Sequence, residues 1–251
     1  MQEPWNLKAD DSRQTDTLPT FIIFTEDEVS ENIYFKYFET SKIKINIISN
    51  QKSKLANVIK AIAYCDKNDL FNYDDDNKSL KSNDIQVWCV YDRDTDFDDK
   101  NKLDEGNVAF SESITMAENS GLKVAWSNDA FELWVLLHFE DIDLTNEESK
   151  KRTHYYSRLT EIFKNIPNPS DDLKKALEYS AFEYKRSLKS ENNFRYIIRP
   201  LMIENTEEAI TRAKNLLDFH KDKNKYCDKN PCTLVFHLVE ELLKAGGKPL
   251  S

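Results

Sequence analysis

Residues 85–98, with the sequence IQVWCVYDRDTDFD, constrain the fold more than any other part of the chain. They begin with a nearly continuous apolar run rich in β-branched and aromatic residues, which is typical of a strand buried on both faces. The run ends in carboxylates at alternate positions, Asp92, Asp94 and Asp96. Carboxylates this close together repel one another unless a cation or a basic side chain answers their charge. The stretch therefore predicts a divalent-cation site at the tip of a buried strand.

Three other short apolar runs predict strands, at residues 20–25, 44–49 and 122–126. Segments with helical spacing lie between them, and the polar segment 66–83 is predicted to be a solvated loop. Strands that alternate with helices favour βαβ units. The fold class predicted is α/β, with a mainly parallel four-stranded sheet flanked by helices. The helices of this part of the chain are expected at 28–40, around 55–62, at 108–119 and at 131–139.

Ligands of such a sheet bind beyond the carboxyl ends of the strands, where the strand order reverses. Glu26 follows the first strand and Asp92 follows the third, so these strands should be neighbours, in the order 2-1-3-4. Ser127 and Asn128 follow the fourth strand at the same edge. Glu132 interrupts a very apolar helix, and it is either a surface carboxylate or a part of the site with Ser127 and Asn128.

The remainder of the chain divides into a polar arm and a helical lobe. Residues 1–18 lack periodicity and are expected to form a flexible N-terminal arm. Residues 19–145 form the predicted α/β domain, and residues 146–251 form a helical lobe packed on it, with no strand expected. Candidate helices of the lobe are residues 146–164, 171–188, 205–220 and 233–245.

Composition excludes several classes of function. The chain has four glycines and neither of the Gly-rich motifs that cradle nucleotide phosphates. Its four cysteines lack C-x-x-C spacing, which favours free thiols in a reducing, cytoplasmic compartment over a zinc site. The sequence has no long apolar run and no leader pattern, so no membrane segment is expected.

Charge is distributed unevenly along the chain. Residues 1–149 carry 15 Lys and Arg against 31 Asp and Glu, a net charge of −16, whereas residues 150–251 carry 20 against 14, a net charge of +6. This polarity is compatible with a polyanion that enters between an acidic and a basic half, and equally with two solvated faces. Five basic residues of the last part would contact a nucleic acid if they line a cleft between the two halves. These residues are Lys185, Arg186, Lys189, Arg195 and Arg199.

Several motifs together resemble the RloB family, bacterial TOPRIM-like proteins related to the abortive-infection component AbiLii. The motifs are TEDEVSE at 25–31, DRD at 92–94, SNDAFELW at 127–134, the pair Tyr184 and Lys185, and the segment at 230–233. The resemblance covers nearly the whole chain after the N-terminal arm. It implies a TOPRIM-like, Rossmannoid sheet domain.

The resemblance also implies site residues. The TOPRIM pattern assigns Mg²⁺ or Mn²⁺ binding to Glu26, Asp92 and Asp94. Asp96 is a further candidate ligand because it belongs to the same run of carboxylates. The resemblance favours Lys185 as the cation that faces the phosphate over a solvated helix lysine. The sequence departs from the pattern where Asp27 replaces the usual Gly after the Glu. It departs again at residues 128–132, which read Asn-Asp-Ala-Phe-Glu in place of Asn-Pro-Cys-Phe-Glu.

Two functions follow from the resemblance. The first is a Mg²⁺-dependent nuclease, a toxic effector of phage defence that hydrolyses phosphodiesters with two metals, acting on RNA in preference to DNA, with tRNA as one candidate. The alternative is a non-catalytic regulatory or assembly subunit of a complex with an ATPase partner. The oligomeric state is left open.

Overall fold

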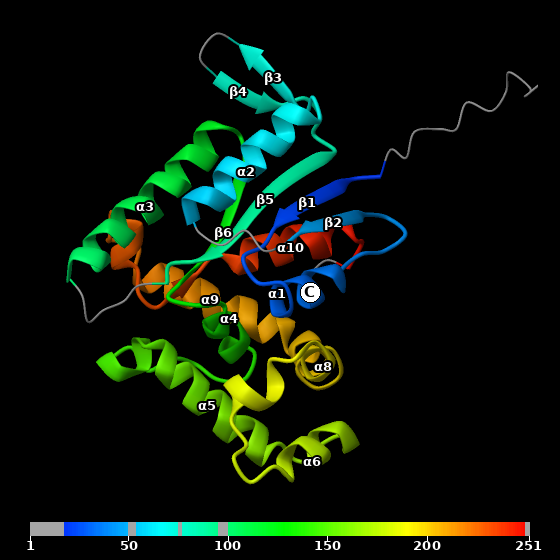
Figure 1. Ribbon diagram of the computed structural model, residues 1–251, viewed down its shortest axis with the longest axis vertical. Helices are drawn as coiled ribbons and strands as arrows, with labels where there is room; N and C mark the ends of the chain where they lie inside the picture. The colour runs from blue at the N-terminus through cyan, green and yellow to red at the C-terminus, as the bar shows by residue number, and fades with distance from the viewer. Residues whose placement is uncertain (1–17, 50–53, 75–76, 95–99, 249–251) are drawn as a thin grey trace, which may run out of the picture.

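The computed structural model describes residues 18–49, 54–74, 77–94 and 100–248. Apart from Leu18, the predicted N-terminal arm lies outside these residues. The chain forms an α/β fold in which helices flank a mixed, mostly parallel five-stranded sheet, and a C-terminal helical region follows (Figure 1). The strands of the sheet are β1 (Thr20–Phe24), β2 (Lys44–Ile48), β5 (Ile85–Asp92), β6 (Lys123–Asn128) and β7 (Cys232–Thr233). The longer helices are α1 (Ser30–Lys36), α2 (Lys54–Lys67), α3 (Lys100–Asn119), α4 (Phe131–Leu137), α5 (Arg152–Asn165), α6 (Asp171–Leu177), α9 (Thr206–Phe219) and α10 (Val235–Ala245).

The sheet has the strand order β2-β1-β5-β6-β7. Its first four strands are parallel and appear in the order expected from the sequence, which confirms that prediction. Phe24 pairs with Cys89, and Asp92 pairs with Ser127, so the ends of β1, β5 and β6 reach the same edge. The direction of strand succession reverses between β1 and β5, which makes this edge the place for a site.

Alternate residues of each central strand enter two separate cores. Phe21 and Ile23 of β1 face the core that contains α1, α4, α5, α9 and α10, whereas Ile22 and Phe24 face α2 and α3. Figure 1 shows these two groups of helices on opposite faces of the sheet. Because β5 has buried residues on both faces, its nearly continuous apolar sequence is explained.

The prediction of a solvated loop at residues 66–83 was wrong. After α2 ends, the segment forms an antiparallel hairpin of β3 (Phe71–Asp74) and β4 (Asn77–Leu80), which projects from the sheet domain (Figure 1). Phe71 is buried and anchors the hairpin, and the Lys78 ammonium lies 5.4 Å from its ring centroid. Most other side chains of the hairpin face solvent, so its composition imitates that of a loop.

The expectation of no strand after residue 146 was also wrong. β7 pairs antiparallel with β6 through two residues, and no periodicity can reveal a strand this short. The helix predicted at 171–188 divides into α6 and a π-helical turn, η2 (Tyr184–Leu188). Residues 191–204, which were not predicted to be helical, form consecutive helical turns; these are α7 (Glu191–Asn193), η3 (Phe194–Ile198) and α8 (Arg199–Glu204).

Helix α3 begins at Lys100, earlier than the predicted residue 108.

Among the described residues, no helix combines the length and the apolar character that a bilayer crossing requires.

We predict that the sheet and the helical region unfold together, because one buried cluster joins β1 and β5 with α4, α5, α9 and α10. Leu136→Ala, at the centre of that cluster, should reduce the free energy of unfolding by about 2–5 kcal/mol. Ile59→Ala, at a position that is 50% exposed on α2, should change it by about 0.5 kcal/mol or less. Thermal unfolding followed by circular dichroism and by tryptophan fluorescence should give coincident transitions, and two separated transitions would contradict the prediction.

Candidate functional site

Carboxylates from two neighbouring strands meet at the point where the strand order reverses. Glu26 lies just after β1, and its Oε2 accepts a hydrogen bond from the backbone N–H of Asp92 at 3.1 Å. Glu26, Asp92 and Asp94 line one pocket of about 140 Å³. The pocket is completed by Asp27, Glu31, Phe131, Glu132, Arg152, Tyr156 and Lys189. The structure therefore brings together the three carboxylates that the sequence singled out.

A buried glutamate shapes the loop that carries Glu26. Glu31, in the first turn of α1, is 1% exposed, and its Oε2 accepts the backbone N–H groups of Glu26 at 3.0 Å and Asp27 at 3.1 Å. The Asp27 carboxylate accepts the N–H groups of Val29 and Ser30, both at 2.9 Å, and so caps the start of α1. The backbone of Asp27 does not enter the left-handed region, so this turn does not require the glycine that the TOPRIM pattern has there.

Burial makes the ionised form of these carboxylates costly. Burial is the largest effect on Glu26, and together with the charge of Asp94 it raises the pKa of Glu26 to about 7, although the N–H of Asp92 acts in the opposite direction. Burial, with the charge of Glu31 next, also raises the pKa of Asp92 well above its ordinary value. A cation that enters the acid cluster would therefore stabilise the ionised carboxylates.

One such cation is Arg152, the first residue of α5. Its guanidinium is paired with Asp94, lies 4.0 Å from Asp92 Oδ2, and donates from Nη2 to the backbone carbonyl of Asp129 at 3.0 Å. Its Nε lies 3.6 Å from Asp129 Oδ2. Burial alone would lower the pKa of Arg152, but the charges of Asp129, Asp92 and Asp94 outweigh burial and raise it. Arg152 thus belongs to the site, although no sequence motif indicated it.

A second cation faces the opposite wall of the pocket. Lys189 donates to Oε1 of Glu132 at 2.6 Å, and the Glu132 side chain is 5% exposed. Burial lowers the pKa of Lys189, but the Glu132 carboxylate raises it by more. Of the two sequence interpretations of Glu132, the structure favours a place in the pocket over an exposed surface.

Ser127 and Asn128 lie beside the pocket and do not line it. The Ser127 hydroxyl is 3.0 Å from that of Thr233, and the Asn128 amide donates to the carbonyls of Cys227 at 3.2 Å and Lys229 at 2.8 Å. Both residues are buried, and they fasten the end of β6 to the C-terminal region.

Of the five basic residues proposed to line the cleft, Lys189 alone lines the pocket. Lys185 lies close by, with its ammonium 5.3 Å from the ring centroid of Tyr156. Arg186 and Arg195 are paired with glutamates of their own helical turns, and Arg199 lies over the ring of Tyr37. Asp96 lies outside the described residues.

The donor set fits a hard divalent cation by its chemistry. The ligands available are carboxylate oxygens, which Mg²⁺ and Mn²⁺ prefer. Asp92 Oδ1 is buried and has no hydrogen-bond partner, so it has a free coordination position. In the described part of the chain, no three Asp, Glu, His or Cys side chains are already spaced around one ion. The carboxylates would therefore have to close around a cation.

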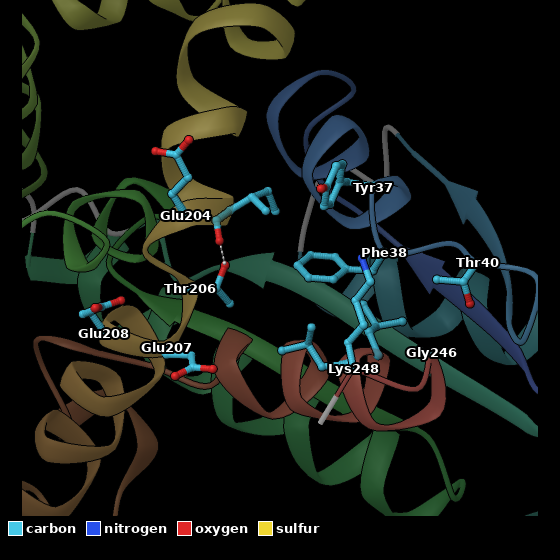
Figure 2. A pocket seen from close by; sticks show the side chains of 12 residues that line it. Tyr37, Phe38, Thr40, Glu204, Thr206, Glu207, Glu208, Gly246 and Lys248 are labelled. Atoms are coloured by element: carbon cyan, nitrogen blue, oxygen red, sulfur yellow. Dashed lines mark hydrogen bonds between the residues drawn. The ribbon is translucent and has the colours of Figure 1, made fainter. Parts of the chain in front are cut away.

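A larger pocket of about 360 Å³ lies on another part of the molecule, between the ends of α1, α8 and α10 (Figure 2). Its lining includes Phe38, Thr206 and Leu242, with Glu204 and Glu208 among its polar residues. None of the residues selected from the sequence lines it, and it is away from the carboxyl ends of the strands. We therefore take the smaller, acidic pocket as the candidate functional site.

The residues of the acidic pocket that sequence reasoning missed include Glu31, Arg152 and Tyr156. Glu31 lies within the TEDEVSE motif, so its position five residues after Glu26, on the first turn of a helix, was a usable signal. Arg152 and Tyr156 come from α5, about 60 residues after Asp92, and their approach depends on tertiary packing.

We predict that the metal-free protein becomes less stable as the pH rises through about 7. Glu26 in the folded state keeps its proton up to about pH 7, whereas in the unfolded chain it releases the proton near its ordinary value of 4.5. Between these values the folded state binds more protons, so stability is greatest at the acidic end and falls toward pH 7. In EDTA, Glu26→Gln should therefore have the higher melting temperature at about pH 8, and a weaker dependence on pH, than the wild type.

Glu28→Gln is the matched control, because it makes the same change at an exposed position in the same loop. If Glu26→Gln and Glu28→Gln shift the melting temperature equally at each pH, the carboxylate of Glu26 is not destabilised by its surroundings.

The pocket and the sheet that supports it lie within the part of the chain matched by a family model. That model describes RloB-like proteins and matches residues 21–242, which include Glu26, Asp92, Asp94, Arg152 and Lys189. No curated protein and no solved structure matches the chain. Because the family model covers most of the sequence, the chain belongs to the RloB-like protein family.

Proposed function

We propose that this protein is a metal-dependent nuclease of TOPRIM type, with the acidic pocket as its active site and Mg²⁺ or Mn²⁺ as its cofactor. The observation that carries the proposal is the contact of Glu26 with the backbone of Asp92 at the strand-order reversal, in a pocket lined by several carboxylates. Membership of the RloB-like family supports it, because the TOPRIM pattern assigns the same positions to metal binding.

Glu26, Asp92 and Asp94 would hold the metal. Divalent ions held by such carboxylates neutralise charge on a phosphodiester and stabilise its leaving oxygen. The pocket lining has no Ser, Cys or Thr, and burial raises the pKa of its phenol, Tyr156, to about 12, so water is the nucleophile that we assign.

The carboxylate of Glu26 has a suitable pKa to act on that water. In the metal-free protein the pKa of Glu26 is about 7, and a divalent cation beside the carboxylate would lower it, so Glu26 would be ionised near neutrality and able to accept a proton. The water oxygen would bond to phosphorus as the ester bond breaks, Glu26 would take the water proton, and the leaving oxygen would take a proton from solvent. Glu26 acts as metal ligand, as general base, or as both.

The size of the pocket suggests how much of the substrate enters it. About 140 Å³ is less than the roughly 300–1,000 Å³ of pockets that enclose whole small-molecule ligands. It suits a phosphate group with its cations, while the neighbouring nucleotides stay on the surface. We assign contact with a flanking phosphate to Lys185, whose ammonium lies 5.3 Å from the ring centroid of Tyr156, a residue of the pocket lining.

We propose RNA as the favoured substrate over DNA, with tRNA as a candidate, and phage defence as the setting, on the strength of the resemblance to TOPRIM-type effectors of such systems. A toxic nuclease needs restraint until infection. An ATPase partner, of the kind that accompanies AbiLii-like proteins, would supply it.

We predict that Mn²⁺ binds to the wild type and that Asp92→Ala weakens the affinity by about tenfold or more, since too few hard ligands remain. Isothermal titration calorimetry with Mn²⁺ alone measures this without any substrate. Glu28→Ala, an exposed carboxylate from the same loop as Glu26, serves as the control and should bind like the wild type. Equal affinities for the wild type and Asp92→Ala would refute the metal site.

We also predict that the protein cleaves cellular nucleic acid and that Glu26→Ala, Asp92→Ala and EDTA each abolish the cleavage. The test is sequencing of RNA and DNA ends after induction, with and without the ATPase partner, in wild type, Glu26→Ala and Glu28→Ala cells. New ends that depend on Glu26 and not on Glu28 are expected. Absence of such ends in both conditions would end the nuclease proposal and leave the regulatory subunit in its place.

A further inference from the structure

Arg152 has an unusual position for a cation. It is the first residue of the 14-residue helix α5, where the partial positive charge of the helix dipole disfavours another positive charge. None of the residues in the first turn of α5 is acidic. The placement of the guanidinium must therefore be stabilised by groups outside the helix.

Those groups are the acids of the candidate metal site. The guanidinium pairs with Asp94 and lies 4.0 Å from Asp92, while its Nε is buried without a hydrogen-bond partner, 3.6 Å from Asp129 Oδ2. Asp92 Oδ1, on the other side of the same ion pair, is buried without a hydrogen-bond partner as well. A well-formed bidentate Arg–carboxylate pair would satisfy these atoms. Arg152 thus supplies charge to the cluster, but its geometry there is incomplete.

A second contact holds the arginine near the site. The same Nη2 that pairs with Asp94 also donates to the backbone carbonyl of Asp129 at 3.0 Å, which is not one of the proposed metal ligands. Asp94 itself is 41% exposed and follows β5 with a positive φ of 46°, an uncommon conformation for a residue other than glycine. The pair of Arg152 with Asp94 is therefore more open to solvent than its contact with the buried Asp129.

We propose that Arg152 is a built-in counter-ion that a divalent cation must displace, and that the displaced guanidinium, still held by Asp129, becomes the group that binds the substrate phosphate. The inference rests on the proposed function and identifies a substrate-binding residue for the same site. A guanidinium and a divalent ion compete for the same Asp92 and Asp94 oxygens, so metal binding breaks the Arg152–Asp94 pair. The freed guanidinium then lies beside the cation with donors suited to phosphate oxygens.

The first measurement uses Mn²⁺ alone. Arg152→Gln removes the competing charge, so its affinity for Mn²⁺ should exceed that of the wild type by about tenfold. Arg152→Lys keeps a charge without the planar fork and should lie between the two. Lys151→Gln is the matched control, since Lys151 is exposed and is paired with Glu148 at 2.6 Å outside the pocket. It should bind Mn²⁺ like the wild type.

Thermal unfolding guards against variants that merely fold poorly. In EDTA, Arg152→Gln should melt below the wild type, because its acids lose their counter-ion. Mn²⁺ should raise its melting temperature by more than it raises that of the wild type, because the stabilisation by a ligand increases with the logarithm of its affinity. If Arg152 only braced the fold, the melting temperature would fall without any gain in Mn²⁺ affinity.

The second measurement is binding of a fluorescent single-stranded RNA of about 20 nucleotides in Ca²⁺, with a gel to confirm that the RNA stays intact. Arg152→Gln should weaken this binding and reduce its dependence on salt by about one phosphate contact, while Lys151→Gln should not. Arg152→Lys should restore part of the affinity.

The outcomes separate this inference from the nuclease proposal. Stronger Mn²⁺ binding and weaker RNA binding in Arg152→Gln support the inference, even if no cleavage is ever found. Unchanged or weaker Mn²⁺ binding in Arg152→Gln, with normal binding in the wild type, overturns the inference and leaves the nuclease proposal standing. If neither protein binds Mn²⁺, both are overturned.

Discussion

Repulsion among closely spaced carboxylates is the interaction on which the arrangement around this site depends. Glu26, Asp92 and Asp94 come from adjacent strand ends, and Glu31 adds a fourth acid that holds the Glu26 loop by its backbone. Burial raises the pKa values of three of them, Glu26, Glu31 and Asp92. Such a cluster is tolerated where cations balance it, and the two cations in the pocket lining both come from the helical region.

These two cations explain part of the uneven charge distribution along the sequence. At the pocket, the acidic first part and the basic last part of the chain meet in the pairs of Arg152 with Asp94 and of Lys189 with Glu132, and away from it Arg158 pairs with Glu140. Many other charges of both parts are paired locally or exposed, as the interpretation of solvated faces requires. The polarity therefore has both origins, and only a small share of the basic residues serves the site.

The sequence was informative where a local pattern decides the structure. The order of the four parallel strands followed from their apolar runs and from the need to bring Glu26 to Asp92. The β3–β4 hairpin was not predicted because a single buried residue, Phe71, anchors it. Strand β7 was not predicted because two residues are too few to show a periodic pattern. The acids of the site could be chosen from their place after strands, whereas Arg152 reaches them through packing of α5 that no spacing encodes.

One feature of the sheet edge bears on how this protein can evolve. Arg93, next to Asp92, is buried and donates to Asn128 Oδ1 at 3.1 Å and to the Cys227 carbonyl at 2.9 Å. Asn128 in turn donates to carbonyls at Cys227 and Lys229. Without the segment around Cys227, the Asn128 amide would lose both of these acceptors and the Arg93 guanidinium would lose one, keeping those on Asn107 and Asn128. A graft of this sheet onto another protein would therefore be destabilised at the edge that carries the acids unless the segment around Cys227 went with it.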